Sequence, residues 1–430
     1  MRNRLALLVL MFGWSVVALP AQTGPAAPAN PTGSGQTSWT FDTFTPGPCS
    51  PTGAPHGGCD PGELVRIRVA TVAGGLVQPW HVTFVPGTGD VLVTELPGRL
   101  RLVRNGVLDP EPVPGWPAPG IPSRSLHSLV LHPDFADNRT VFLTYVKGDD
   151  TRATTTAITR ARFDGRALSS VEEIFEADAW GGGSSPARAE FGPDGMLYFA
   201  VGVRDSMNSS SDASDRMKAQ DLSNHAGKVL RLTDRGGVPP DNPFVDRPGA
   251  KAEIYTYGHR NLQGFTWHPD TGEMWATEIG PMGGDELNRL IPGGNYGWPL
   301  VSLGKIYNST LVSEQPWFRP GMEMPVMFWV PAISPSSLMI YRGDRFPLWK
   351  GHFFIGALSG QQLQRVAFDQ PPPQTERRES LLVPIDARVR DVREAPDGSI
   401  YIAVERDTQG GPGSTRQSPT GALLRIEPAA

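Results

Sequence analysis

The sequence predicts an all-β protein, a six-bladed β-propeller, from a strand pair that occurs six times, the turn residues between its strands, and strand-like segments at both ends of the repeat region. In each copy a turn such as Pro-Asp-Gly leads into a short apolar strand, and a second short strand with one or two arginines follows. The first strands lie within residues 86–95, 132–145, 192–201, 268–277, 349–356 and 395–404. Their partners are expected at 99–102, 159–162, 229–232, 287–290, 363–366 and 423–426.

The two ends of the repeat region are expected to close the ring. Residues 64–69 and 423–426 are both strand-like, and pairing them in one blade would remove the exposed edges of an open sheet. Successive first strands lie roughly 46 to 81 residues apart, which mostly exceeds the ~40 to 50 residues of a minimal blade. We assign the excess to loops, which commonly carry the binding groups of a rigid scaffold.

Charge and composition narrow the class of protein. The net charge is -5, and acidic and basic residues are interspersed along the chain. The sequence therefore lacks the basic stripe that is typical of proteins binding nucleic acid or an anionic membrane. Because no linker divides the repeats, residues 61–430 are expected to form one propeller domain.

Residues 1–21 are typical of a signal peptide. Arg2 and Arg4 supply the charged start, Leu5 to Val17 the apolar segment, and Ala21 a small residue near a cleavage point. The apolar segment is shorter than the ~20 residues of a spanning helix, which favours a signal peptide over a membrane anchor. We therefore expect an exported protein, periplasmic or extracellular, with no stable membrane span.

The segment 22–60 that follows is rich in Pro, Gly, Ser, Thr and Ala, and it is expected to be disordered because it offers little apolar surface to bury. Its two cysteines, Cys49 and Cys59, are the only ones in the chain. In an exported protein they favour a disulfide. Metal ligation by the pair is the weaker alternative, since no second Cys or His pair stands at zinc spacing.

Five stretches of the chain carry a family resemblance. They are residues 78–100, 131–135, 219–231, 257–299 and 333–338, with Gln78-Pro-Trp-His81, Tyr257-Gly-His-Arg-Asn-Leu-Gln-Gly264 and Gly293-Gly-Asn-Tyr-Gly-Trp-Pro299 among their motifs. In this order and spacing they resemble the glucose/sorbosone dehydrogenase family, the soluble glucose and aldose sugar dehydrogenases that depend on pyrroloquinoline quinone (PQQ). The resemblance covers nearly the whole chain from about residue 64 onward.

The resemblance implies that one face of the propeller holds PQQ, with Arg260, Asn261, Arg388 and Arg390 as its ligands. PQQ carries three carboxylates, and arginine binds planar carboxylates through two parallel hydrogen bonds. The alternation of a strand would place Arg388 and Arg390 on the same side. Without the resemblance, arginines at a blade rim would more often be solvated or paired with an acidic neighbour.

The resemblance also implies a calcium ion bound through the backbone carbonyls of Gly280 and Pro281. Oxygen ligands from a rigid turn suit a hard cation. The alternative is that this Gly-Pro pair only ends the strand before it.

The expected chemistry is oxidation of an aldose at its anomeric carbon, in which a histidine removes the hydroxyl proton and PQQ takes the hydride. The family's histidine position falls on Ser184, whose hydroxyl is too weak a base to act unaided. His127 is the candidate to replace it, followed by His259. The alternative for His127 is a buried or rim histidine with satisfied hydrogen bonds.

Other expected pocket positions also differ from the family: Ser123, Ile279 and Ser359 stand where it has amide or charged side chains. The chain could therefore be a divergent dehydrogenase acting on a small sugar, or a propeller that has lost catalysis and serves as a binding module. A calcium-dependent lactonase is a further alternative, because that class also uses six-bladed propellers with acidic and amide ligands. Its acidic candidates would be Glu95, Asp205, Glu278 and Asp285.

Overall fold

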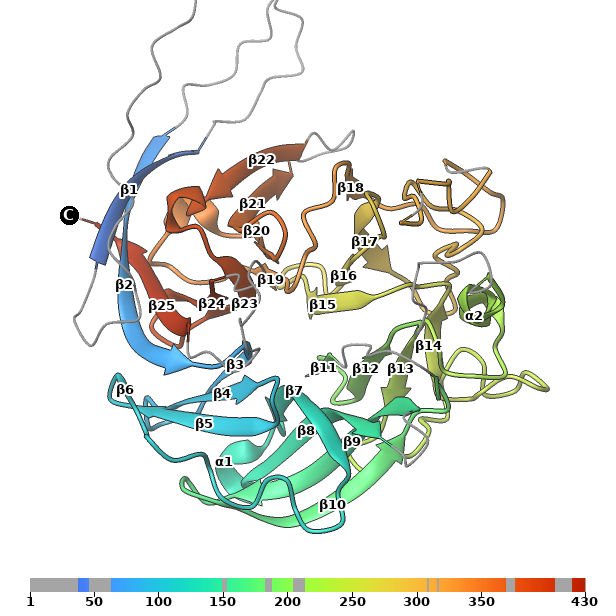
Figure 1. Ribbon diagram of the computed structural model, residues 1–430, viewed down its shortest axis with the longest axis horizontal. Helices are drawn as coiled ribbons and strands as arrows, with labels where there is room; N and C mark the ends of the chain where they lie inside the picture. The colour runs from blue at the N-terminus through green and yellow to red at the C-terminus, as the bar shows by residue number, and fades with distance from the viewer. Residues whose placement is uncertain are drawn as a thin grey trace, which may run out of the picture.

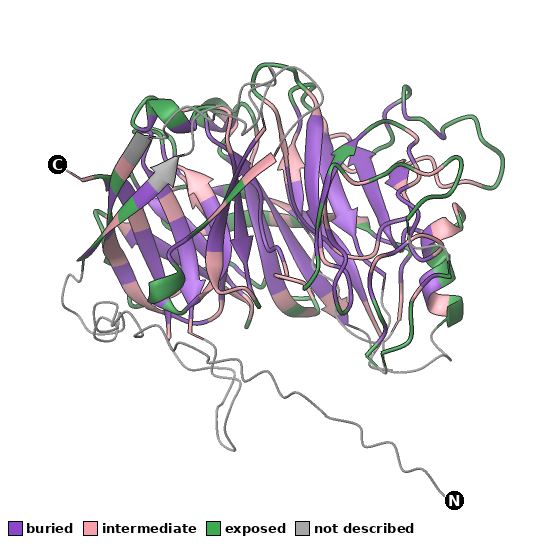
Figure 2. Ribbon diagram, turned by 90° about the horizontal axis from the view of Figure 1, so that it is seen from above, coloured by how far each residue is buried: buried purple, intermediate pink, exposed green. Residues whose placement is uncertain are grey.

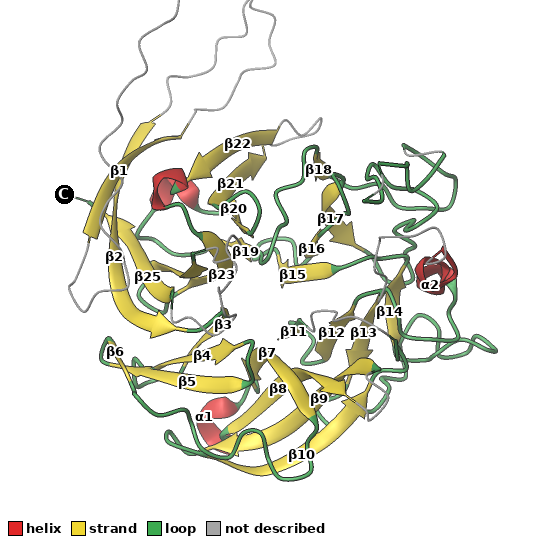
Figure 3. Cartoon of the chain, in the orientation of Figure 1, coloured by secondary structure: helices red, strands yellow, loops and turns green. Residues whose placement is uncertain are grey.

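Six β-sheets surround a common centre, which confirms the predicted six-bladed propeller (Figure 1). The structure is a computed structural model, and it describes residues 38–45, 63–148, 153–181, 188–203, 213–307, 309–314, 317–368, 376–406 and 420–429. Strands dominate these residues, and loops connect them around the outside of the ring (Figure 3). Residues 1–21, Cys49, Cys59, Ser184 and Asp205 lie outside the described residues.

Five blades consist of four antiparallel strands each, in chain order from the centre outward. The first blade contains β3 (Pro79–Phe84), β4 (Val91–Glu95), β5 (Arg99–Arg104) and β6 (Val107–Leu108), and the second β7 (Ser123–Leu131), β8 (Thr140–Gly148), β9 (Thr154–Phe163) and β10 (Leu168–Glu176). The third contains β11 (Ala189–Phe191), β12 (Leu197–Val201), β13 (Lys228–Leu232) and β14 (Ile254–Tyr257). The fourth contains β15 (Leu262–Trp267), β16 (Met274–Glu278), β17 (Asp285–Leu290) and β18 (Met327–Trp329), and the fifth β19 (Met339–Ile340), β20 (Phe353–Ala357), β21 (Gln362–Phe368) and β22 (Glu376–Leu381).

The sixth blade joins the two ends of the described chain. Its order is β1 (Ser38–Thr45), β2 (Glu63–Leu76), β25 (Gly421–Pro428), β24 (Ile400–Glu405) and β23 (Arg388–Glu394). Val69 pairs with Ile426 across β2 and β25, which confirms the predicted closure of the ring. The helical segments are short: α1 (Phe135–Asn138), α2 (Ala213–Met217), and the 3-10 turns η2 (Lys218–Gln220), η3 (Pro347–Trp349) and η4 (Val383–Ile385).

The predicted strand pairs form the second and third strands of every blade. In the first blade, for example, Val93 of β4 lies opposite Arg101 of β5. The second strands β4, β12, β16 and β20 are buried along their whole length. They are apolar on both faces because a neighbouring blade packs against each face, as the continuous burial of the blades in Figure 2 shows.

Strand β1 departs from the disorder expected for residues 22–60. Ser38–Thr45 pairs with β2 along its whole length, with Trp39 opposite Val69 and Phe41 opposite Ile67. Trp39 belongs to the core of the sixth blade, and Phe41 packs against it. Alternation of apolar and polar residues in this short stretch is the physical reason, since it gives one face of the strand something to bury.

The six innermost strands define two mouths of the propeller. A cavity of about 450 Å³ is lined by the final residues of β3, β7, β11 and β23, so these strands end at the same side of the ring. We call that side the second mouth, and the side where the strands begin the first mouth. Among the described residues, no helix has the length and apolar character needed to cross a membrane.

Candidate active site

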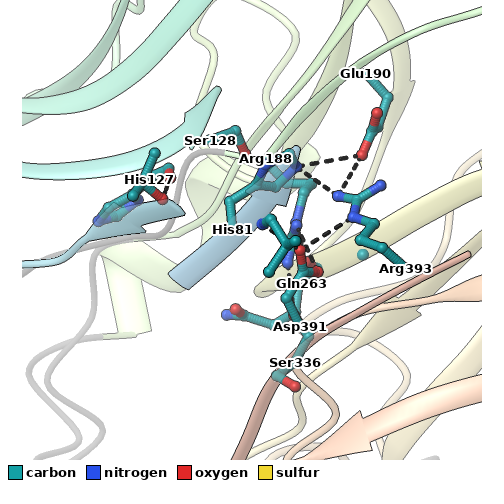
Figure 4. Close-up of polar contacts among 12 residues, drawn as sticks. His81, His127, Ser128, Arg188, Glu190, Gln263, Ser336, Asp391 and Arg393 are labelled. Atoms are coloured by element: carbon teal, nitrogen blue, oxygen red, sulfur yellow. Dashed lines mark hydrogen bonds and ion pairs between the residues drawn. The ribbon is translucent and has the colours of Figure 1, made fainter. Parts of the chain in front are cut away.

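A buried ion network joins residues of several blades (Figure 4). Arg188, which is 1% exposed, donates from Nε to the carbonyl oxygen of Gln263 (2.6 Å), from Nη1 to Asp391 Oδ1 (3.1 Å) and from Nη2 to the carbonyl oxygen of Ser336 (2.8 Å). Asp391 also accepts from the Val82 amide at 2.9 Å. One guanidinium therefore ties together residues of the third, fourth, fifth and sixth blades.

Arg393 extends this central ion network toward the second mouth. Its Nε donates to Asp391 Oδ2 at 3.0 Å, and its Nη2 lies 2.6 Å from Glu190 Oε1. His81 Nδ1 lies 3.1 Å from the Thr83 hydroxyl, which donates to the carbonyl oxygen of Leu129. Nδ1 therefore carries the proton, and Nε2 can accept from Arg393.

Burial and charge shift the pKa values of this network in opposite directions. Burial alone would raise the pKa of Asp391, but the nearby charges of Arg393 and Arg188 lower it to about 2. Burial would likewise raise the pKa of Glu190, but the charge of Arg393 lowers it to about 2. Burial, with the charge of Arg393, lowers the pKa of His81 to about 4. The imidazole is thus neutral at pH 7, while both carboxylates are ionised.

The first mouth contains a layered arrangement of Arg390, Trp80 and His127. The guanidinium of Arg390 lies 5.6 Å from the Trp80 ring centre, and the Trp80 and His127 rings are stacked at 5.1 Å. Arg390 Nε donates to Glu405 Oε1 at 2.9 Å, and Arg388 Nε lies 3.6 Å from the same oxygen. The two arginines predicted to hold the cofactor thus share Glu405.

Arg260 lies before β15, at the same mouth. Its Nη1 donates to the carbonyl oxygens of Ile279 (3.0 Å) and Gly280 (3.2 Å), and its guanidinium lies 5.6 Å from the Trp298 ring centre. The neighbouring Asn261 accepts from Gln263 Nε2 at 2.9 Å. Arg260 therefore reaches the turn that was expected to bind calcium.

Asp285 fixes that turn to the fifth blade. This fully buried carboxylate accepts from the Gly280 amide at 2.9 Å through one oxygen, and from the Ile333 and Ser334 amides at 2.7 Å each through the other. Burial raises its pKa to about 6, although the three amides act in the opposite direction. The Ser334 hydroxyl lies 2.9 Å from that of Ser359. One side chain therefore sets the spacing of two loops at the first mouth.

The two candidate histidines have different surroundings. His259 is fully buried, with Nδ1 3.0 Å from Glu278 Oε2 and Nε2 2.9 Å from the Thr256 hydroxyl. Both of its ring nitrogens are engaged in the fold, which leaves it no means of reaching a substrate. His127 is 4% exposed, its Nε2 lies 3.0 Å from the Ser125 hydroxyl, and its ring contacts Trp80 at the first mouth.

Of the four acidic residues considered for a lactonase metal site, Asp205 lies outside the described residues, and the other three make hydrogen bonds within the fold. Glu95 accepts from the Val77 amide at 2.6 Å and from Arg99 Nε at 2.6 Å, while Glu278 bonds the Arg260 amide and His259. Asp285 accepts the three amides described above. In the part of the chain that the structure describes, no group of three or more His, Cys, Asp or Glu side chains could hold a metal ion. The geometry gives the lactonase alternative no support.

Three features of this region were not predicted from the sequence. They are the central ion network, the hydrogen bonds by which Asp285 joins two loops, and the carboxylate of Glu405 that Arg388 and Arg390 share. Only Glu190, Asp391 and Arg393 carried a signal, because charged residues that alternate with apolar ones on an innermost strand must point into the ring. Asp391 and Arg393 are close in sequence, but the bond between Arg188 and Asp391 joins residues 203 positions apart.

The side chains at the first mouth fit a polycarboxylate such as PQQ. Arg260, Arg388 and Arg390 contribute three positive charges at this mouth, where Arg388 and Arg390 share the carboxylate of Glu405. Guanidinium groups bind carboxylates strongly. In this structure the carbonyl of Gly280, one of the two expected calcium ligands, accepts from the Arg260 guanidinium.

The fold and the arginines at the first mouth describe a six-bladed propeller with a site suited to an anionic ligand, and comparison with known proteins identifies the family. The chain belongs to the glucose/sorbosone dehydrogenase family, whose model matches residues 76–411. Aldose sugar dehydrogenase YliI of Escherichia coli is 32% identical over 84% of this chain and 93% of its own length.

Two solved structures show the same relationship. The soluble aldose sugar dehydrogenase from Escherichia coli, in its apo form, has a TM-score of 0.74 and 30% identity, covering 84% of this chain and all of that one. The PQQ-bound aldose sugar dehydrogenase from Streptomyces coelicolor has a TM-score of 0.62 and 27% identity, covering 83% and 96% of the two chains. The family assignment predicted from the motifs is therefore confirmed, and the chain is a sugar oxidoreductase.

Proposed function

We propose that this protein oxidises an aldose or a related sugar at its anomeric carbon, with PQQ bound at the first mouth. The observation that carries the proposal is that Arg390 lies over Trp80 and Arg260 over Trp298 at the first mouth, in a chain whose relatives include a PQQ-bound aldose sugar dehydrogenase. Arg388 and Arg390, from the sixth blade, and Arg260 with Asn261, from the fourth, would hold the cofactor's carboxylates and carbonyls.

PQQ, when bound, supplies a quinone that accepts the hydride from the sugar's anomeric C–H bond, so that the sugar leaves as a lactone. The chain's own residues must bind and orient the sugar and accept the proton of its anomeric hydroxyl. His127 is the proposed base, because its imidazole lies in one stack with Trp80 and Arg390. Ser125, 3.0 Å from Nε2, would orient the ring. Such a site is atypical, since serine replaces the family's histidine at position 184.

Calcium at Gly280 and Pro281 is a separate part of the proposal. The metal could reach the Gly280 carbonyl only after the Arg260 guanidinium had moved away from it, and we assign no step of the reaction to the metal. Titration of the PQQ-loaded protein with calcium, followed by the cofactor's absorbance, tests this part by itself.

Export is proposed from the first 21 residues alone. Sequencing the amino terminus of the protein recovered from the periplasm or medium should show a start near residue 22. Recovery of the full-length chain from the cytoplasm would contradict this part.

The central experiment reconstitutes the purified chain with PQQ and follows dye reduction with a panel of aldoses. Turnover is expected, and His127→Ala should lower kcat at least ten-fold while leaving PQQ affinity near that of wild type. His259→Gln is the matched histidine control: it should lower stability, since Glu278 loses its buried partner. A chain that binds PQQ and sugar without any dye reduction would instead support the binding-module alternative.

A further inference from the structure

The second mouth holds a cavity to which nothing in the proposed function assigns a role. It has a volume of about 450 Å³ and lies among the final residues of β3, β7, β11 and β23 and the residues that follow β19 and β23. This volume falls within the ~300 to 1,000 Å³ of small-molecule sites. Three members of the central ion network, His81, Glu190 and Arg393, line this cavity.

The floor of this cavity presents a hydrogen-bond donor and an acceptor side by side. Arg393 and Glu190 pair through Nη2 and Oε1 at 2.6 Å, and their side chains remain 20% and 19% exposed. Among the described residues, neither Arg393 Nη1 nor Glu190 Oε2 has a partner, and both residues line the cavity. Both groups are held rigidly, because Arg393 is fixed from behind by Asp391.

The rim of the cavity carries a second pair of an arginine and a glutamate. Arg342 and Glu394 line it, and the Arg342 amide donates to Glu394 Oε2 at 2.7 Å. The Arg342 guanidinium has no partner within the described part of the chain, and neither has Glu394 Oε1. Phe84 and Phe191, both half-buried, contribute ring surface to the walls.

The charges of the lining cancel. Two arginines face two glutamates, and His81 is neutral because its pKa is lowered to about 4. A lining without net charge gives neither an anion nor a cation an advantage. Paired donors and acceptors suit hydroxyl groups, because each hydroxyl can accept from a guanidinium while donating to a carboxylate. Aromatic rings provide apolar surface for C–H groups between hydroxyls.

We propose that the second mouth is a binding site for a neutral polyhydroxylated molecule, a monosaccharide or a polyol, held between the Arg393–Glu190 pair on the floor and the Arg342–Glu394 pair at the rim. The site is independent of the cofactor and would bind sugar without oxidising it. Its openness and its reliance on solvent-facing hydrogen bonds make the expected Kd millimolar, about -4 kcal/mol.

The test uses methyl α-D-glucopyranoside, which has no free anomeric hydroxyl and so cannot be oxidised to a lactone at the first mouth. Calorimetric titration of the full chain, with and without PQQ, should give one millimolar site in both cases. Arg342→Met and Glu394→Gln should each weaken binding at least five-fold, because each removes one member of the rim pair. Arg388→Met, at the first mouth, is the matched control and should leave this affinity unchanged.

Crystals soaked in the glucoside should show it between Glu190 and Glu394. The proposal is overturned if both rim variants bind the glucoside as wild type does, if D-gluconate binds more tightly than the glucoside, or if density appears without calorimetric binding, which would mean binding at crystal concentration only. None of these outcomes bears on PQQ binding or dye reduction, so the proposed function stands or fails separately.

Discussion

The arginine at the centre of the ring and the arginines at the first mouth serve opposite purposes. Arg188 directs all three of its nitrogens at fixed partners on other blades, and it is 1% exposed. Arg388 and Arg390 come from one strand and share one carboxylate, Glu405. A cation whose bonds are all made inside the protein stabilises the fold, whereas several cations gathered on one acid retain a positive field for a ligand.

The largest effect should come from breaking the central arginine. Arg188→Met leaves Asp391 with Arg393 as its one remaining arginine and takes the donor from two buried backbone carbonyls, and removing one member of a buried ion pair typically costs about 3 to 5 kcal/mol. Urea denaturation should show this loss, whereas Arg388→Met should change stability by less than about 1 kcal/mol. The double variant Arg188→Met/Asp391→Asn should recover part of the loss, because the buried carboxylate that has lost Arg188 is then replaced by a neutral amide. Equal destabilisation by Arg188→Met and Arg388→Met would mean that the central arginine contributes no more to stability than an arginine of the first mouth.

The second prediction sharpens the same comparison through ligand binding. Arg388→Met should weaken PQQ about 10- to 100-fold, in line with the ~1.5 to 3 kcal/mol of a hydrogen bond to a charged group. Fluorescence titration of the apo protein measures the change. Arg342→Met, an exposed arginine at the second mouth, is the control and should bind PQQ as wild type does. Unaltered PQQ affinity in Arg388→Met would mean that this arginine of the sixth blade does not bind the cofactor.

A substitution of Asp285 tests whether this buried carboxylate holds the loops of the first mouth in place. Asp285→Asn replaces one acceptor oxygen by a donor, and it should cost about 1 to 3 kcal/mol by leaving a backbone amide unsatisfied. Hydrogen exchange should accelerate in the peptides that contain Gly280, Ile333 and Ser334, while the Arg188 region keeps its protection. Uniform acceleration across the ring would mean that the carboxylate has no local role.

The smallest expected effect concerns pH. Burial, followed by the neighbouring charge of Glu278, raises the pKa of Glu286 on β17 from 4.5 to about 8. The folded state therefore keeps a proton that the unfolded chain loses above about pH 4.5, and stability should fall as pH rises from 5 to 8. Because the side chain is only partly buried, we expect a loss of about 1 kcal/mol. Glu286→Gln should flatten this slope in thermal melts recorded across the same range, and an unchanged slope would assign it to another group.

The sequence predicted the architecture because the fold repeats a local signal. Turn residues followed by an apolar strand mark β4 and its five counterparts, and these strands are buried on both faces wherever the sequence is continuously apolar. The innermost strands show little of this pattern of turn residues followed by an apolar strand. β11, for example, has three residues, and its place is fixed by the contacts of the adjoining Arg188 with other blades.

The site was predictable only as a set of residue types. Family motifs indicated Arg260, Arg388 and Arg390, but the partners that decide what each side chain can do lie elsewhere in the chain. Glu405 is separated from Arg390 by 15 positions and Gly280 from Arg260 by 20. The unexpected strand β1 has the same cause: Trp39 finds its apolar surroundings on residues that are distant in sequence.

The sixth blade has a consequence for how the ring is completed. β2 and β25 are neighbours in space, yet Val69 and Ile426 are separated by almost the whole length of the described chain. Contacts between such distant positions form slowly, because the entropy of a very large loop must be lost first. Pairing of β25 with β2 is therefore expected to be a late step in folding, and it completes the blade whose innermost strand carries Asp391.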